Sequence, residues 1–262
     1  PFSTDTGRPH VLDCACHDGH TLAQTGQAMK TTRALAFVWA AGLAVALSGP
    51  ASSLHAATAY VWGSSPSEAA PYDTWDKAAH SLPVAVSYAQ TNAGYDTVVV
   101  TDGTYNVAAQ MMVTNTLAIR SVNGAAQTAV RASGTGYRLF NVKAADSLIA
   151  GFTLANAYNN ADSDYGYGGG AVGTSQRSCV ISNCVLIGNF MLHYGGAVNG
   201  GTVVNCVVAS NTATRAGGGL YNSLARNCLI VGNLGGGEGG GGGMYGGAAD
   251  NCTIVSNTAW RV

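Results

Sequence analysis

Charged side chains are scarce in this chain. Only 10% of its 262 residues are charged, and 13 acidic residues against 12 basic ones leave a formal net charge of −1. Such a near-neutral balance gives no reason to expect a nucleic-acid or membrane-surface partner. The chain also lacks a nucleophile elbow, a P-loop and a complete zinc-finger spacing. We therefore assign no catalytic residue and no metal site from motifs.

Helical periodicity is missing from the second half of the chain. No segment there carries an apolar stripe with a 3.6-residue period, which excludes ankyrin-like and tetratricopeptide-like repeats. The fixed leucines of leucine-rich repeats are absent as well. What the half does contain is a repeat of about 22 residues, which is shorter than the roughly 30 residues of a βαβ unit.

The repeat is marked by four Asn-Cys pairs that are 22, 22 and 24 residues apart. Each pair opens the phrase Asn-Cys-x-(Leu/Val/Ile)-x-x-Asn, and a glycine phrase precedes each of the last three pairs at a constant distance. The variation in repeat length therefore falls in one segment, which we expect to be a surface loop. The pairs begin at Asn183, Asn205, Asn227 and Asn251.

Side-chain alternation places Cys184 and Leu186 on one face of a strand and Val185 on the other. The sequence therefore predicts an all-β fold, a right-handed single-stranded parallel β-helix, with coils stacked about 4.8 Å apart. The asparagines of the pairs would occupy corners, where they tolerate the left-handed conformation. The cysteines would form an inward ladder of small apolar side chains: Cys184, Cys206, Cys228 and Cys252. We expect free thiols there, with disulfides between adjacent coils as the alternative.

The front of the chain has the pattern of a secretory signal peptide. Basic residues in 29–33 are followed by an apolar run at 34–47 and then by small residues. The run is shorter than the roughly 20 residues that cross a bilayer. Cleavage after Ala56, Ala57 or Ala59 would fit, and only the last follows a literal Ala-x-Ala.

These patterns predict three segments. Residues 1–28 would be a disordered upstream segment, 29–59 the signal peptide, and 60–262 the β-helix domain, whose last coils would lie beyond residue 262. Within the domain, 60–96 would form a cap with a short helix, and 97–262 the coils. Cys14, Cys16 and nearby histidines in the first segment have zinc-ligand chemistry but no second spaced pair, so they do not make a metal site.

The repeat phrases carry a family resemblance. GGAV and GGGL alternating with LIGN, VASN and IVSN resemble the GGA(I)/FxxN repeats of the chlamydial polymorphic outer-membrane proteins. More broadly, the chain from about Tyr60 to Val262 is similar to the secreted right-handed β-helix repeat proteins of the pectate-lyase-like superfamily. The resemblance implies a bacterial protein that is secreted or held at the cell surface or outer membrane, with any membrane anchor beyond residue 262 and no transmembrane helix in the mature region.

The resemblance also directs the search for chemistry. Pectate-lyase-like enzymes use carboxylates, some of them to hold calcium, on neighbouring coils, whereas acids are few here. Asp162 and Asp164 would be the candidates for a Ca²⁺ site, and a solvated polar loop is the alternative. No other cofactor is expected.

Tyrosines are the more suggestive residues. Tyr165 and Tyr167 follow the two aspartates, and three more lie beside glycine phrases: Tyr194, Tyr221 and Tyr245. Exposed stacked tyrosines would hold sugar rings, whereas a packing ladder that stiffens the sheet is the alternative. The leading hypothesis is an exported, non-catalytic structural, adhesive or glycan-contacting scaffold. A polysaccharide lyase or hydrolase of the pectate-lyase-like type is the alternative, and the fold alone does not separate the two.

Overall fold

The computed structural model describes residues 56–160, 168–237 and 240–260. The expected upstream segment and most of the expected signal peptide lie outside these residues. So do Asp162, Asp164, Tyr165 and Tyr167, which means that the candidate Ca²⁺ site stays a prediction.

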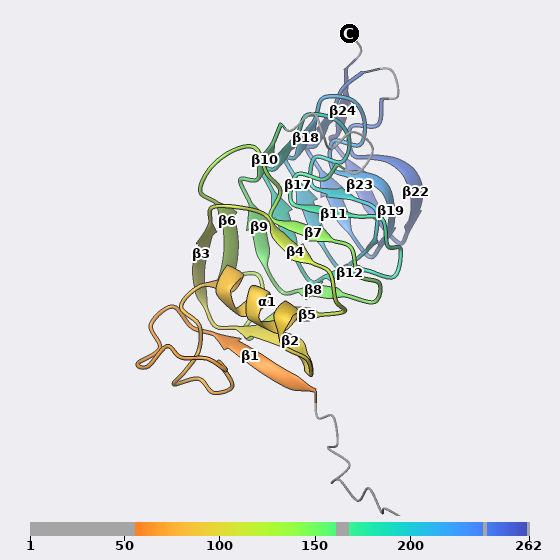
Figure 1. Cartoon of the computed structure of the whole chain (residues 1–262). Helices are drawn as coiled ribbons and strands as arrows, with labels where there is room; N and C mark the ends of the chain where they lie inside the picture. Colours follow the sequence, from red (N-terminus) through yellow and green to blue (C-terminus); the bar gives the residue numbers. More distant parts are fainter. Residues whose placement is uncertain (1–55, 161–167, 238–239, 261–262) are drawn as a thin grey trace, which may run out of the picture. The chain divides into compact units, whose positions relative to one another are not determined.

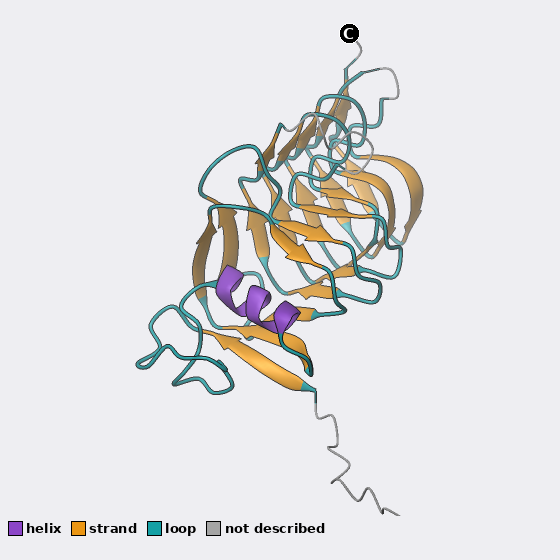
Figure 2. Cartoon of the chain, viewed as in Figure 1, coloured by secondary structure: helices purple, strands orange, loops and turns teal. Residues whose placement is uncertain are grey.

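The described chain winds into stacked coils, and all pairings between its named strands are parallel (Figures 1 and 2). Each coil contributes short strands to separate faces, and equivalent strands of successive coils pair in register. The predicted parallel β-helix is therefore confirmed.

Three faces of the solenoid are built as follows. One carries β1 (Ala57–Val61), β2 (Tyr95–Val100), β5 (Ala118–Ser121), β8 (Leu148–Ala150), β12 (Val180–Ser182) and β16 (Thr202–Val204). The next carries β3 (Gly103–Val107), β6 (Thr128–Ala132), β9 (Thr153–Ala155), β13 (Val185–Ile187), β17 (Val207–Ala209), β20 (Leu229–Val231) and β23 (Thr253–Val255). The third carries β10 (Tyr158–Asn159), β14 (Phe190–Met191), β18 (Thr212–Ala213), β21 (Leu234–Gly235) and β24 (Thr258–Ala259).

A fourth row of strands bears most directly on function. It consists of β4 (Met111–Val113), β7 (Phe140–Val142), β11 (Val172–Thr174) and β15 (Val198–Asn199). In the later coils, β19 (Leu220–Arg226) and β22 (Met244–Asp250) are long enough to pair with both this row and the first face. The two rows therefore join into one 12-stranded sheet.

The core follows the alternation of the repeat phrase. Leu186, Val208 and Ile230 are fully buried, and Cys184, Cys206 and Cys228 are at most 3% exposed. Cys252 is half-buried, and the described cysteines form no disulfide. Burial raises the pKa of the Cys179 thiol to about 12, because the thiolate would lose its hydration.

The first asparagine of each phrase lies at an exposed corner in the left-handed conformation. The φ angles of Asn183, Asn205, Asn227 and Asn251 are 51°, 54°, 52° and 49°. Each later Nδ2 donates to the Oδ1 of the preceding corner, at 3.5, 3.2 and 2.7 Å in chain order. Asparagine tolerates this backbone conformation better than most residues, which accounts for its recurrence at this corner.

The second asparagine of each phrase is buried instead. Asn189, Asn211 and Asn233 are at most 1% exposed, and each Nδ2 donates to the next coil's Oδ1 at 2.9 Å. The same Nδ2 also donates to a backbone carbonyl of the preceding coil; for Asn211 this is Leu186 O, at 2.9 Å. This second ladder satisfies its buried amides along the solenoid axis.

The N-terminal cap contains a short helix. The apolar spacing over 74–90 predicts a helix that restarts at Pro83, and only its second half is helical: α1 spans Leu82–Thr91, with turns and bends over most of 74–81. Pro83 lies in the first turn of α1, the one place in a helix where its missing N–H costs nothing. Figure 1 shows α1 beside β1 and β2 at the N-terminal end of the stack, where it buries Leu82, Ala85, Val86 and Ala89.

The first strand also differs from expectation. It was expected at 60–62, but β1 begins at Ala57, three residues before the expected domain boundary. Ala57 N donates to Gly94 O at 2.7 Å, and Ala59 is fully buried. Within the described residues, no helix is long and apolar enough to cross a membrane.

Candidate functional site

One column of side chains on the fourth strand row points away from the core. Asn199 of β15 is in register with Tyr221 of β19, which is in register with Tyr245 of β22. Their neighbours Val198 and Leu220 are fully buried on the core side. Because side chains alternate along a strand, the column faces outward.

Tyr194, Tyr221 and Tyr245 form what we call the tyrosine cluster. The ring centroids of Tyr194 and Tyr221 are 4.5 Å apart with the planes tilted by 33°. Those of Tyr221 and Tyr245 are 5.6 Å apart with the planes almost parallel, at 7°. Tyr221 lies between the other two rings, so it offers its edge and hydroxyl group outward rather than a face. Tyr245 is the more exposed, at 40%.

The glycine phrases explain how the strands carry these rings so close together. Gly217 and Gly241 have φ angles of 65° and 75°, a region that side chains disfavour. A Cβ on Gly241 would lie 2.9 Å from the Cβ of Tyr245, and one on Gly217 would lie 3.1 Å from that of Tyr221. A larger residue at either position would push the tyrosine out of the column.

A cavity of about 560 Å³ opens beside the tyrosine cluster, lined also by Thr214, Arg215, Ala216 and Gly237. The Arg215 guanidinium carbon lies 6.0 Å from the centroid of the Tyr194 ring, within the range of a cation–π contact. No acidic side chain is among the described residues that line the cavity. The site therefore offers aromatic edges, hydroxyl groups and one positive charge.

Sequence reasoning anticipated part of this site. It selected the three tyrosines, and the structure brings them together; whether they bind a ligand is not tested by their packing. It missed Arg215, because arginines have no fixed position in the repeat. Its place in the chain could have indicated it, because Arg215 immediately precedes Ala216, which pairs with Tyr194 in a parallel bridge between coils.

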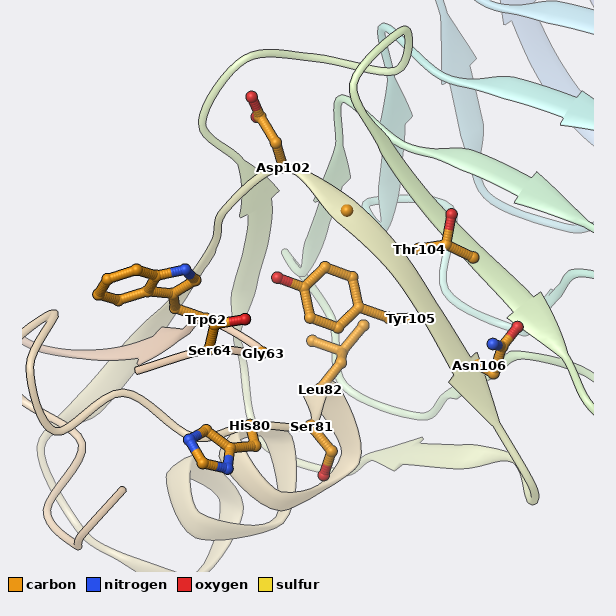
Figure 3. A pocket seen from close by; sticks show the side chains of 11 residues that line it. Trp62, Gly63, Ser64, His80, Ser81, Leu82, Asp102, Thr104, Tyr105 and Asn106 are labelled. Carbon is orange, nitrogen blue, oxygen red and sulfur yellow. The ribbon is translucent and has the colours of Figure 1, made fainter. Parts of the chain in front are cut away.

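A second cavity, of about 390 Å³, lies between the cap and the first coil (Figure 3). Several of its polar groups have protein partners. His80 Nδ1 is 3.1 Å from Glu68 Oε2 and its Nε2 is 2.9 Å from Ser65 O, while Asp102 accepts from Asn123 at 3.0 and 3.1 Å.

Tyr105 also lines this cavity, and its hydroxyl bonds to Thr101. Burial raises the pKa of Tyr105 above its ordinary value. The cap cavity is also the smaller of the two. Elsewhere in the described ranges, no three His, Cys, Asp or Glu side chains gather as a metal site requires.

Comparison with known proteins finds no matching family and no matching curated sequence. Solved structures do match. A pectin methylesterase in complex with a hexasaccharide is 16% identical with a TM-score of 0.46, over 78% of this chain and 66% of its own. Pectin methylesterase PemA from Erwinia chrysanthemi is 16% identical with a TM-score of 0.43, over 66% of this chain and 54% of its own.

The catalytic domain of a GH87 α-1,3-glucanase in complex with nigerose is 17% identical with a TM-score of 0.43, over 69% of this chain and 32% of its own. The chain thus spans about half of the Erwinia enzyme and a third of the glucanase domain. At these identities, and with TM-scores below 0.5, the similarities carry no argument about what this chain binds.

Proposed function

We propose that this chain is an exported, non-catalytic β-helix scaffold that contacts glycans through the tyrosine cluster. The observation that carries the proposal is the cavity of about 560 Å³ in which tyrosines from successive coils converge with Arg215. Surface cavities lined by aromatic rings and a few convergent polar groups are the usual form of a small-molecule site.

The chemistry of the cavity suits a sugar. A pyranose unit has an apolar C–H surface and a rim of hydroxyl groups, so it needs both aromatic contact and hydrogen-bonding partners. The tyrosine hydroxyls, Thr214 and Arg215 supply those partners, and the aromatic rings supply the apolar contact. The rings are held by their mutual stacking, so little conformational entropy is lost when a ligand binds.

The alternative, a polysaccharide lyase or hydrolase, requires an acid or base beside the bound sugar. No described residue that lines the cavity is a carboxylate, so neither the acid–base pair of a hydrolase nor the Ca²⁺-holding carboxylates of a lyase are assigned there. We therefore favour binding over catalysis. Export is part of the proposal and is supported by the basic, apolar and small-residue pattern within 29–59.

The test is a comparison of two tyrosines with equal exposure. Tyr245 in the cluster is 40% exposed, and Tyr158, which stacks on Phe190 on another face, is 41% exposed. Cellohexaose, xylohexaose and hexagalacturonate are titrated calorimetrically against the wild type and against Tyr245→Ala and Tyr158→Ala. We expect at least one hexasaccharide to bind the wild type, and Tyr245→Ala to weaken it about tenfold, the effect of losing roughly 1.4 kcal/mol of contact.

Tyr158→Ala should bind as the wild type does. Equal weakening by both variants, or no binding of any hexasaccharide to the wild type, would contradict the proposal. Release of unsaturated product from polygalacturonate in the presence of Ca²⁺ would favour the lyase instead.

A further inference from the structure

Asn199 is unusual among the buried amides of this protein. Its side chain is only 5% exposed, yet its Nδ2 has no hydrogen-bond partner among the described residues. The buried asparagines of the repeat are fully bonded along the axis, as Asn211 illustrates. A buried amide donor without a partner needs an explanation, and a ligand that supplies the acceptor is one.

A cavity of about 270 Å³ adjoins this amide. Its polar side chains are Thr174, Ser175, Arg177, Asn199 and Asn222. The Thr174 hydroxyl oxygen accepts from Gln176 N at 3.0 Å, and the hydroxyl also bonds to the Cys179 side chain. Among the described side chains around the cavity there is no carboxylate, so the cavity is rich in donors and favours a ligand that is rich in acceptors.

The backbone keeps this cavity open. Gly200 and Gly201 line it with φ angles of 80° and 69°. A Cβ on Gly201 would lie 3.0 Å from Cys179 O, and one on Gly200 would collide with Thr174 O. Glycine is therefore required where the chain passes between the cavity and the preceding coil.

The Asn199 cavity lies next to the tyrosine cluster. Asn199 is in register with Tyr221, and Tyr221 lines the larger cavity while the following residue, Asn222, lines the smaller one. The two cavities thus flank the same position of the sheet, and consecutive residues of β19 contact both. A ligand of several sugar units has the length to occupy the two at once.

We propose that Asn199 is a specificity-determining residue of the glycan site. When a pyranose unit enters the Asn199 cavity, the Asn199 side chain turns its sealed Nδ2 toward the cavity and donates a hydrogen bond to a hydroxyl or ring oxygen of that unit, while the adjoining unit contacts the tyrosine cluster. The inference rests on the proposed function, because it assigns the second subsite of the same ligand.

The column provides a matched control. Asn141 lies two coils earlier in the same outward column, through Gly173, and is similarly buried at 8%. Its Nδ2 donates to Gln110 Oε1 at 3.4 Å, and it does not line the Asn199 cavity. Substituting Asn141 therefore changes an equally buried amide without touching the proposed subsite.

The experiment titrates the same hexasaccharides against Asn199→Asp, which replaces the donor with an acceptor of equal shape, and against Asn141→Asp. Asn199→Asp should weaken the tightest-binding hexasaccharide by about tenfold or more, the effect expected when a ligand oxygen loses its donor. Asn141→Asp should bind as the wild type does. If Asn199→Asp does not fold, Asn199→Ala removes the amide without adding a charge.

The melting temperature separates binding from a structural role. Because Nδ2 has no partner among the described residues, Asn199→Ala should melt within about 2 °C of the wild type while binding weakly. Wild-type affinity in both Asn199 variants, with binding still lost in Tyr245→Ala, would overturn the inference and leave the proposed function standing. No hexasaccharide binding by the wild type would overturn both.

Discussion

The two asparagines of each repeat phrase have opposite environments. The corner residue Asn205 is exposed and needs its left-handed backbone, whereas Asn211, six residues later, is fully buried and needs its amide. Asn211 Nδ2 donates to Asn233 Oδ1 and to Leu186 O, and its own Oδ1 accepts from the backbone and side chain of Asn189. One residue type thus meets a conformational requirement at one site and a hydrogen-bonding requirement at the other.

This difference gives a prediction at the residue scale. Asn211→Ala removes the acceptor of the buried Asn189 backbone N–H and a donor to the Leu186 carbonyl, so it should lower the free energy of unfolding by about 3 kcal/mol. Asn205→Gly keeps a residue that accepts positive φ and should change it by less than about 0.5 kcal/mol. Urea denaturation measures both free energies of unfolding. Equal losses in the two variants would show that the buried asparagines contribute no more to stability than the corner asparagines.

The sequence predicted the inward cysteine ladder but missed the buried asparagine ladder, for a physical reason. Alternation correctly places Cys184 and Leu186 inward, but it also puts position 188 inward and Asn189 outward. Gly188 adopts φ 64°, and this turn changes the parity so that Asn189 enters the core. Periodicity holds within a strand and is lost at a corner that only the backbone conformation reveals.

At the scale of the element, β1 decides between the expected signal-peptide cleavage positions. Cleavage after Ala59 would remove Ala57, Thr58 and Ala59, which pair with β2. Cleavage after Ala56 would leave the whole strand. We therefore propose that cleavage of the predicted signal peptide leaves Ala57 as the first residue, although the literal Ala-x-Ala precedes Tyr60.

Mass measurement of the N-terminal peptide of the exported protein tests this expectation. Ala56→Val should block or shift cleavage, because the residue before the cut must be small, whereas Ala59→Val should leave the N-terminus at Ala57. A mature N-terminus at Tyr60, abolished by Ala59→Val, would show that the first three residues of β1 are dispensable.

The cap helix shows what local pattern does and does not determine. The apolar spacing from Trp75 onward predicted a helix, and its second half formed around Pro83. Trp75 instead packs its ring 4.4 Å from that of Tyr60 and stays 37% exposed. A contact with a strand distant in sequence overrode the helical spacing, which is why the start of α1 was misplaced.

At the scale of the whole molecule, burial changes along the axis. Ile230 is fully buried, whereas its stacked partner Ile254 in the last described coil is 48% exposed. Solenoid coils draw their stability from their neighbours, so in a polypeptide of residues 1–262 alone the coil that contains Ile254 should open more readily.

We expect a gradient of amide exchange in the 262-residue chain. Peptides covering β23 and β24 should exchange faster than those covering β13 and β17 when hydrogen exchange is followed by mass spectrometry. The Ile230 and Leu186 regions provide the internal control, since both are fully buried. Uniform protection across all coils would mean that the stack opens as one cooperative unit.

The fold was predictable from the sequence and the site only in part. A repeat with a constant segment specifies stacking by itself, because each coil repeats the same pairing. Arg215 and Asn199 enter the proposed site because of the residues beside them in neighbouring coils. Which residues those are depends on the register across the stack, and loop lengths alone do not give that register. The tyrosines could be selected from the sequence as candidate site residues by their type, whereas a single asparagine among many could not.

The register of the column also sets the length of the aromatic surface in steps of one coil. Tyr221 and Tyr245 occupy the same position in successive coils, so the column grows in whole coils and never in fractions of one. Duplicating one repeat would lengthen the aromatic run by one ring and leave every other pairing in place. Deleting one would shorten it by the same increment. The length of the aromatic surface is therefore set by the number of repeats, and it can change without altering any single contact.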